Sequence, residues 1–176
     1  MRKVFQIAFG AMLALLLLAC DKKPTESTQP TDPTKGWVLK AGQWDMIASG
    51  AVGENRETEC FIKEQTVDDI FEHIQIGMAS TASQECKQVS KQTENGKPVY
   101  ISACKAGDPS NGLESVQARF VFDTVNNDHR VIDITLSMML KDDLTPERKA
   151  ELAAKKAEFE KNAKSRLDFH YKGKCA

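Results

Sequence analysis

Cysteine is the residue type whose number and spacing say most about chemistry in this sequence. Cys20 follows a long apolar run, while Cys60, Cys86, Cys104 and Cys175 are spread over the rest of the chain. A thiolate is both a nucleophile and a metal ligand, but no two of these cysteines have the close C-x-x-C spacing that zinc sites favour. An even set of four predicts two disulfides, with three possible connectivities, if the chain reaches an oxidising compartment.

The residues before Cys20 predict export. Arg2 and Lys3 give a basic start, and the thirteen residues 7–19 are all apolar or small. Thirteen helical residues reach roughly 20 Å, which is short of the ~30 Å hydrocarbon core of a bilayer. The run ends in Leu17-Leu18-Ala19-Cys20, which resembles the lipobox of bacterial lipoproteins, where cleavage precedes a cysteine whose thiol accepts a diacylglycerol. We therefore expect a signal peptide over 1–19 and a lipid anchor on Cys20.

The anchor places the mature chain on the periplasmic side of a membrane in the cell envelope. Asp21 directly follows the lipidated cysteine and resembles the inner-membrane retention signal of enterobacterial lipoproteins, which favours the inner over the outer membrane. Loss of Arg2 and Lys3 leaves 22 basic against 25 acidic residues. A mildly acidic chain lacks the basic footprint of a nucleic-acid-binding protein. The expected partners are the membrane and an envelope protein or a small apolar ligand.

Histidines do not suggest a shared metal site. His73, His129 and His170 fall in different segments, and no two have i, i+3/i+4 or strand-alternate spacing. Such spacing is what brings two imidazoles to one side of a helix or strand. We therefore expect solvated surface histidines, no bound metal and no cofactor.

Paired carboxylates are the candidates for acid–base catalysis. They are Asp68-Asp69, Asp142-Asp143 and Glu57/Glu59. The two aspartate pairs fit the starts of helices or the residues that lead into them, where negative charge is favourable. A serine nucleophile is not supported either, because no G-x-S-x-G motif is present and Ser49-Gly50 is a turn signal. We predict no catalytic residue.

Two tryptophans and a methionine pair could line a ligand groove. Trp37 and Trp44 have large aromatic side chains that could form the walls of an apolar site. The hydrophobic core is nevertheless the favoured position for both. For Met138-Met139 we expect one side chain in the core and one on the surface.

The elements that must position these residues follow from composition and periodicity. Residues 20–35 are polar, carry three prolines and have no large apolar side chain after Cys20, so we expect a disordered tether. Residues 36–176 are enough for one disulfide-stapled β-rich domain. Apolar residues alternate over 116–122 and 132–140 around Asn126-Asn127-Asp128, which predicts a central hairpin.

A second hairpin is predicted around the turn Glu94-Asn95-Gly96-Lys97. Cys86 and Cys104 lie almost equally far from this turn, and both fall on the more polar parity of their strands. A small bulge would set them opposite each other, within disulfide reach. This pairing leaves Cys60 to bond with Cys175.

Further strands and two helices complete the expected domain. Trp37 and Leu39 have one parity and Trp44 and Met46 the other, with Gly42 between, which predicts a strand with a bulge. Alternation over 167–171 predicts the last strand. Thr66-Val67-Asp68-Asp69 resembles a capping box ahead of a helix with Ile70, Phe71 and Ile74 on one stripe. A second, charged helix is expected over 146–166, with Thr145 as its N-cap.

The fold class that follows is mainly β, of the α+β kind. We expect an antiparallel sheet or half-open barrel of about six to seven strands. One helix precedes the central hairpins, and the long helix precedes the last strand.

Several motifs together resemble a known family. They are Ala41-Gly42-Gln43-Trp44, Cys60 with the following Glu64-Gln65, the pair Cys86 and Cys104, and the terminal Lys172-Gly173-Lys174-Cys175. The chain from Gly36 onward resembles the small four-cysteine periplasmic proteins grouped as domain of unknown function 3617. The resemblance implies an all-β periplasmic domain with no established activity, and it supplies no catalytic residue. The lipobox and the long charged helix depart from that pattern.

These observations favour a non-enzymatic binding or interaction module held on a membrane. The favoured contact element is the charged helix over 146–166. The alternatives are an enzyme of envelope metabolism with an unrecognised site, or an inhibitor of an enzyme.

The anchor gives the first test. Cys20→Ala removes the acylation site, so we expect an uncleaved or soluble protein instead of a processed membrane protein. Membrane fractionation and mass spectrometry of the amino-terminal peptide measure this, with Asp21→Ser as a control that keeps the anchor. A Cys20→Ala protein that is still processed and membrane-bound would refute the lipid anchor.

Overall fold

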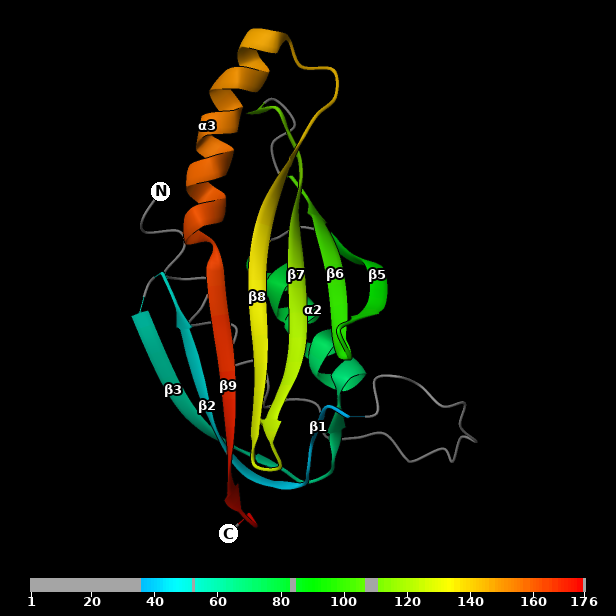
Figure 1. Cartoon of the computed structure of the whole chain (residues 1–176), viewed down its shortest axis with the longest axis vertical. Helices are drawn as coiled ribbons and strands as arrows, with labels where there is room; N and C mark the ends of the chain where they lie inside the picture. Colours follow the sequence, from blue (N-terminus) through cyan, green and yellow to red (C-terminus); the bar gives the residue numbers. More distant parts are fainter. Residues whose placement is uncertain (1–35, 52, 83–84, 107–110, 176) are drawn as a thin grey trace.

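A seven-stranded antiparallel sheet is the main element of the fold (Figure 1). The structure is a computed structural model that describes residues 36–51, 53–82, 85–106 and 111–175. The predicted signal peptide, lipobox and tether lie outside these residues. Within the described part of the chain, no helix is long and apolar enough to cross a membrane.

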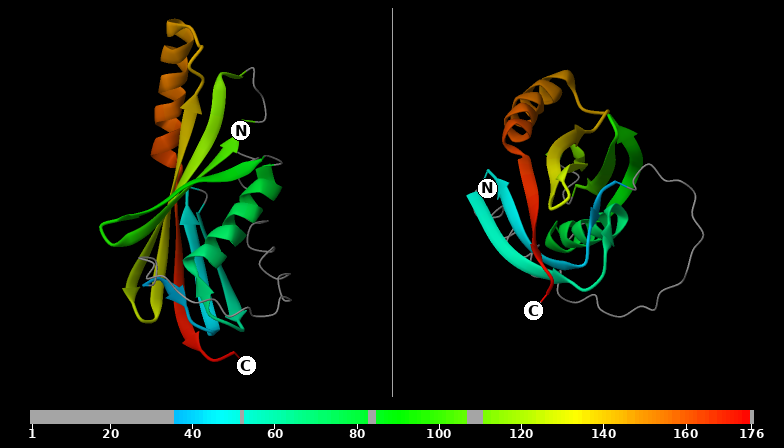
Figure 2. Two further views of the ribbon diagram at one scale, coloured as in Figure 1. Left: turned by 90° about the vertical axis from the view of Figure 1, so that its right-hand side faces the viewer. Right: turned by 60° about the horizontal axis from the view of Figure 1, so that its bottom comes forward.

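The strands of the sheet are β3 (Gly53–Phe61), β2 (Gly42–Gly50), β9 (Lys164–Gly173), β8 (His129–Leu140), β7 (Leu113–Asn126), β6 (Lys97–Lys105) and β5 (Cys86–Glu94), in the order in which they lie side by side. A separate two-stranded sheet joins β1 (Val38–Leu39) to β4 (Gln65–Thr66). The helix α2 (Val67–Ala82) lies against one face of the large sheet, and α3 (Pro146–Asn162) stands beside its end (Figure 2). The predicted class is confirmed: 59% of the structure is strand, and the sheet is open, not closed into a barrel.

Local sequence explains the two predicted hairpins. Asn95 and Gly96 both have positive φ (51° and 77°) in the turn between β5 and β6, as a tight hairpin turn requires. Asn126 Oδ1 accepts a hydrogen bond of 2.9 Å from the backbone N–H of Asp128 in the turn between β7 and β8. Both hairpins are confirmed.

The helix α2 closes the core over the sheet. Its capping box is confirmed: an Asp69 carboxylate oxygen accepts from the Thr66 N–H at 2.8 Å, and Thr66 Oγ1 accepts from the Asp69 N–H at 3.3 Å. The Phe71 ring packs 4.6 Å from Tyr100 and 5.4 Å from Phe120, measured between ring centroids. Aromatic pairs at this spacing add to the stabilisation from burial alone. The predicted apolar stripe of this helix is buried, as expected.

The more polar face of β6, on which Cys104 was predicted, is the face that turns toward the core. Tyr100, Ser102 and Cys104 are all buried. Tyr100 donates a 2.6 Å hydrogen bond to Asp68 of α2, and Gln75 of the same helix donates to Ser102 at 3.2 Å. Hydrogen bonds of this kind offset the cost of burying the two hydroxyl groups, so this face can turn toward the helix.

The two tryptophans occupy the core, as predicted. Trp37 and Trp44 are almost completely buried, and their indole N–H groups donate to the carbonyl oxygens of Val131 (3.3 Å) and Lys40 (2.9 Å). The phase change at Gly42 lies at the junction between β1 and β2, where Gly42 has φ 139° and a Cβ would lie 2.4 Å from the Gly173 carbonyl oxygen. The predicted irregularity lies one residue later, where the β2–β9 ladder shifts register between Gln43 and Trp44.

The long helix is shorter than predicted. Thr145 is its N-cap, with Oγ1 accepting from the Arg148 N–H at 3.3 Å, but the helix ends at Asn162. Lys164 and Arg166, expected in its last turn, belong to β9. The strand begins there because the backbone of β9 pairs with β8 from Thr135↔Lys164 onward.

Both predicted disulfides are present. Cys86 and Cys104 face each other across β5 and β6, and the ladder shifts register between Gln88 and Ser90, where a bulge was expected. Cys60 at the end of β3 bonds to Cys175, with a Cα–Cα distance of 5.7 Å. This second bridge ties the chain end to an outer strand of the sheet.

The two disulfides should differ in their contribution to stability. Their sequence separations are 115 and 18 residues, which the chain-entropy model converts to about 4–5 and about 3 kcal/mol. We therefore expect the pair Cys60→Ser/Cys175→Ser to lower the free energy of unfolding more than Cys86→Ser/Cys104→Ser. Urea denaturation measures both, and peptide mapping without reduction checks the pairing. An equal or opposite order would contradict this account.

Candidate functional site

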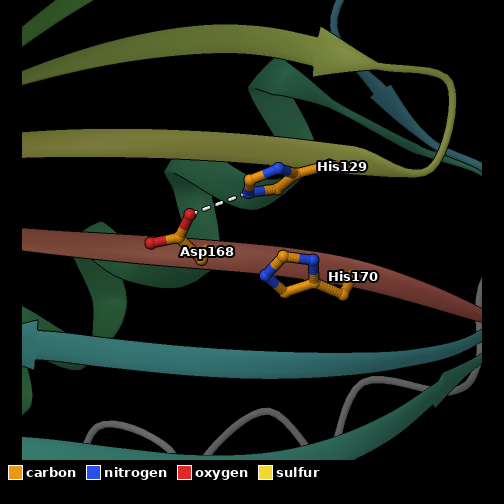
Figure 3. A group of neighbouring side chains, drawn as sticks. All are labelled: His129, Asp168 and His170. Atoms are coloured by element: carbon orange, nitrogen blue, oxygen red, sulfur yellow. Dashed lines mark hydrogen bonds and ion pairs between the residues drawn. The ribbon is translucent and has the colours of Figure 1, made fainter.

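Three side chains that could bind a metal or move a proton lie together on the sheet face that points away from α2 (Figure 3). Asp168 and His170 alternate along β9 with the core residues Leu167 and Phe169, so they point to the opposite face. His129 begins β8 and is the direct ladder partner of His170. The group is called the His–Asp–His cluster below.

The cluster is close enough for direct interaction. His129 Nε2 and Asp168 Oδ1 lie 2.8 Å apart. The two imidazole rings stack with centroids 4.1 Å apart and planes inclined by 25°. One ligand atom from each of the three residues lies within 4.8 Å of the others, and each residue is half-buried.

Two arginine contacts control the charge on Asp168. Arg166 donates to both of its carboxylate oxygens, at 2.9 and 3.3 Å, and also reaches Asp133 of β8 at 3.5 Å. Burial by itself would raise the pKa of the Asp168 carboxyl. Hydrogen bonds from Arg166 and His129 outweigh burial, so this pKa lies below its ordinary value.

On the side away from β8, the cluster lies next to strand β2. Asp45 is the ladder partner of His170, accepts a 2.8 Å hydrogen bond from Thr58 and lies 3.1 Å from Lys172 Nζ. Hydrogen bonds from Thr58 and Lys172 lower the pKa of Asp45. Burial, followed by the neighbouring His129, lowers the pKa of His170. The cluster therefore has an ionised carboxylate beside an imidazole that favours its neutral form.

The expectation that the histidines lie apart is wrong for His129 and His170. Spacing along the chain cannot detect a pair that a non-local ladder creates between two strands. The alternate spacing of Asp168 and His170 on one strand was the available signal. His73 does lie apart from the other two histidines, and its Nδ1 contacts the Asp69 carbonyl oxygen at 2.6 Å.

The carboxylate pairs have mainly structural surroundings. Asp69 caps α2, and Asp68 holds Tyr100 and Lys91 at 2.6–3.0 Å. Burial and the hydrogen bond to Asp68 raise the pKa of Tyr100. Asp142 precedes α3 and accepts a 2.8 Å hydrogen bond from Lys149 at its backbone carbonyl. None of these contacts requires a catalytic role.

Glu59 differs from the other predicted carboxylates. It is half-buried on β3 beside Trp44 of β2. Burial, with a smaller effect of the Glu57 charge, raises the pKa of Glu59. In the pair Glu57/Glu59, the pKa of Glu59 is therefore shifted. The cause is burial beside Trp44 and the like charge of Glu57, which does not require a catalytic role.

A second feature is an arm that extends past β9. It consists of α3 with residues 113–117 of β7 and 137–140 of β8. Leu113–Gln117 pair with Ser137–Leu140, beyond the last β8–β9 pair. In Figure 1, α3 lies beside this part of β8 in line with β9. Met138 is half-buried and Met139 is 37% exposed. The prediction that one of the two methionines lies in the core is therefore wrong.

The arm is held by a narrow contact. Lys156 donates a 2.7 Å hydrogen bond to the Met138 carbonyl oxygen, which caps the open edge of β8. Leu152 and Leu144 lie against Gly112, where an added Cβ would come within 2.8 Å of Leu152. None of the residues of α3 is buried. The helix thus touches the sheet along one side and leaves the other side exposed.

Comparison with known proteins adds no assignment. No family model, curated protein or solved structure matches this chain. The resemblance to domain of unknown function 3617 therefore stays a prediction.

The raised pKa of Glu59 makes a testable prediction about pH. Its protonated form is favoured in the folded state, so its contribution to stability is present below the unfolded pKa and is lost as pH rises through the folded one. We expect Glu59→Gln to raise the urea midpoint at pH 7 and to change it little near pH 4. Glu57→Gln is the matched control and should give a smaller gain. A loss of stability at pH 7 in Glu59→Gln would show that the carboxylate is favourably paired.

Proposed function

We propose that the mature chain is a lipid-anchored envelope protein that acts as a non-enzymatic binding module, with an envelope protein as its ligand. The exposed side of α3 carries the proposal. A helix of 17 residues without a buried residue adds little hydrophobic stabilisation to its own domain. The side of α3 that faces the sheet covers the edge of β8. Contact with a partner protein would give a role to the exposed side of the helix.

Two observations support the envelope location. The lipobox resemblance and the short apolar run predict an anchor on Cys20. Both predicted cysteine pairs lie at disulfide distance, which suits an oxidising compartment. The acidic residue Asp21 favours the inner membrane within this proposal.

Charge on the helix favours a protein over a lipid headgroup or nucleic acid as its partner. The α3 sequence has five basic and four acidic side chains. Anionic membranes and nucleic acids select clusters of Lys and Arg, and α3 has no such excess. Its exposed side instead combines charges of both signs with Ala150, Ala153, Ala154 and Ala157, which are all exposed. Small side chains between mixed charges allow another protein backbone to approach closely.

Site-specific photo-crosslinking of the full lipoprotein in cells tests this proposal. A photoreactive residue replaces Ala150, Ala153 or Ala157 on the exposed side, or Leu152 or Phe159 on the side that faces the sheet. We expect one common adduct from the exposed positions, much weaker or no adduct from the other two, and none from Asn127 at the opposite end of the β7–β8 hairpin. An adduct pattern without this helical periodicity would contradict α3 as the contact element.

A deletion gives an independent measurement. Leu140 and Ala163 can be joined by a short bridge, because Ala163 accepts a backbone hydrogen bond from Leu136, four residues before Leu140. Four strand residues span about 13 Å, so a Gly/Ser bridge of about six residues is long enough. We expect both disulfides to form and the adduct partner no longer to be retained by the variant. Retention of the partner at full strength would overturn the proposal.

One contact favours an enzyme as the second candidate. A histidine oriented by a carboxylate, as His129 is by Asp168 at 2.8 Å, is the arrangement of a general base. An enzyme would lose turnover on substitution of His129, His170 or Asp133 by alanine while the fold survives. Substrate turnover that depends on these residues would replace the binding-module proposal.

A further inference from the structure

We propose that His129, Asp168 and His170 form a binding site for a divalent transition metal ion of the zinc or copper class. Two imidazoles and one carboxylate are a ligand set that these metals prefer. Calcium and magnesium prefer ligands that are all oxygen. The site is separate from the α3 surface and does not depend on the proposed function.

The backbone under the cluster is already in place. His129 and His170 are paired in the β8–β9 ladder, and Asp168 pairs with the neighbouring Val131. The ladder continues past the histidines, since the Tyr171 N–H donates to the Asp128 carbonyl oxygen at 2.9 Å. On its other side β9 pairs with β2. The three side chains thus project from a central part of the sheet, not from a loose end.

Only side-chain rotation is needed to close the site. The candidate ligand atoms lie within 4.8 Å of one another. Metal bonds of about 2.0–2.2 Å in tetrahedral geometry place ligand atoms about 3.3 Å apart. A contraction of about 1.5 Å, from those two values, is within the reach of χ rotations in half-buried residues. Three protein ligands leave a fourth position open toward solvent.

Arg166 is the group that competes with a metal ion. It donates to both oxygens of Asp168, and its charge opposes the approach of a cation. Asp133 offers a second partner to the same guanidinium at 3.5 Å. Arg166 can therefore transfer to Asp133 when Asp168 turns toward a metal, and no charged group is left unpaired.

The local charge balance also suits a dication. The ion pairs next to the two histidines join Asp168 and Asp133 to Arg166, and Asp45 to Lys172. These pairs contain three carboxylates and two cationic groups. His129 and His170 also lie ring on ring, with centroids 4.1 Å apart, so both imidazoles border the same space as Asp168.

The test is calorimetric titration of the full protein as isolated in detergent, without a histidine tag and after treatment with EDTA. We expect one equivalent of Zn²⁺ or Cu²⁺ to bind, and Mg²⁺ and Ca²⁺ not to compete. His129→Ala and His170→Ala should each weaken the binding. Loss of a residue that only hydrogen-bonds to a metal ligand typically costs about 10–100-fold, so loss of a ligand itself should cost at least as much. His73→Ala, which removes a histidine outside the cluster, is the matched control and should bind as the unchanged protein does.

A variant that binds the metal more tightly distinguishes a loss of ligands from a loss of folding. Arg166→Gln removes the competing cation and should strengthen the binding, which loss of structure cannot do. The electron paramagnetic resonance spectrum of the Cu²⁺ form should show coupling to two imidazole nitrogens, and to one in His170→Ala. Zn²⁺ and Cu²⁺ that bind no better than Mg²⁺, or binding that survives both histidine variants, would overturn the proposal.

Discussion

The insertion of β9 between β2 and β8 is the interaction on which the rest of the structure depends. The amino-terminal hairpin of β2 and β3 has no ladder to the β5–β8 strands except through β9. Nearly the whole chain must therefore be made before the seven strands can join. The order of strands makes this sheet rich in contacts between distant residues, which is typical of slow folding. The Cys60–Cys175 bond locks the same arrangement, because it fixes the residues just after β9 to the end of β3.

Sequence patterns identify the parts of the fold that are local. The β5–β6 and β7–β8 hairpins combine alternating strands with Asn and Gly turns, and the capping box at Thr66 marks the start of α2. Cys86 and Cys104 can be paired because they belong to one such hairpin. The outer strand β3 was not predicted, since its sequence GENRETECF is polar on both sides and its residues are largely exposed. Its pairing with β2 comes from backbone hydrogen bonds, which leave no hydrophobic pattern.

The features that could not be predicted come from contacts between distant segments. The polar side of β6 faces the core because α2 brings Asp68 and Gln75 to Tyr100 and Ser102. The helix α3 ends early because β8 provides a ladder for Lys164 and the residues after it. The His–Asp–His cluster exists because the register of β9 sets His170 opposite His129. A shift of one residue would turn His170 toward the core and Phe169 toward solvent, so the hydrophobic core fixes the cluster.

The same strand separates the two candidate surfaces. The arm leaves the sheet at Ala163, whose carbonyl oxygen accepts from the Leu136 N–H at 2.9 Å, and the cluster lies further along β9. Between them, Lys164, Ser165 and Arg166 are held in the ladder with β8. A ligand at the cluster can reposition the side chains of Asp168 and Arg166, while the backbone hydrogen bonds on both sides of β9 keep the strand in place. The His129↔His170 pair lies beyond the ladder residues of the arm. A change at one surface can thus leave the other in place, because the strand that joins them is central in the sheet.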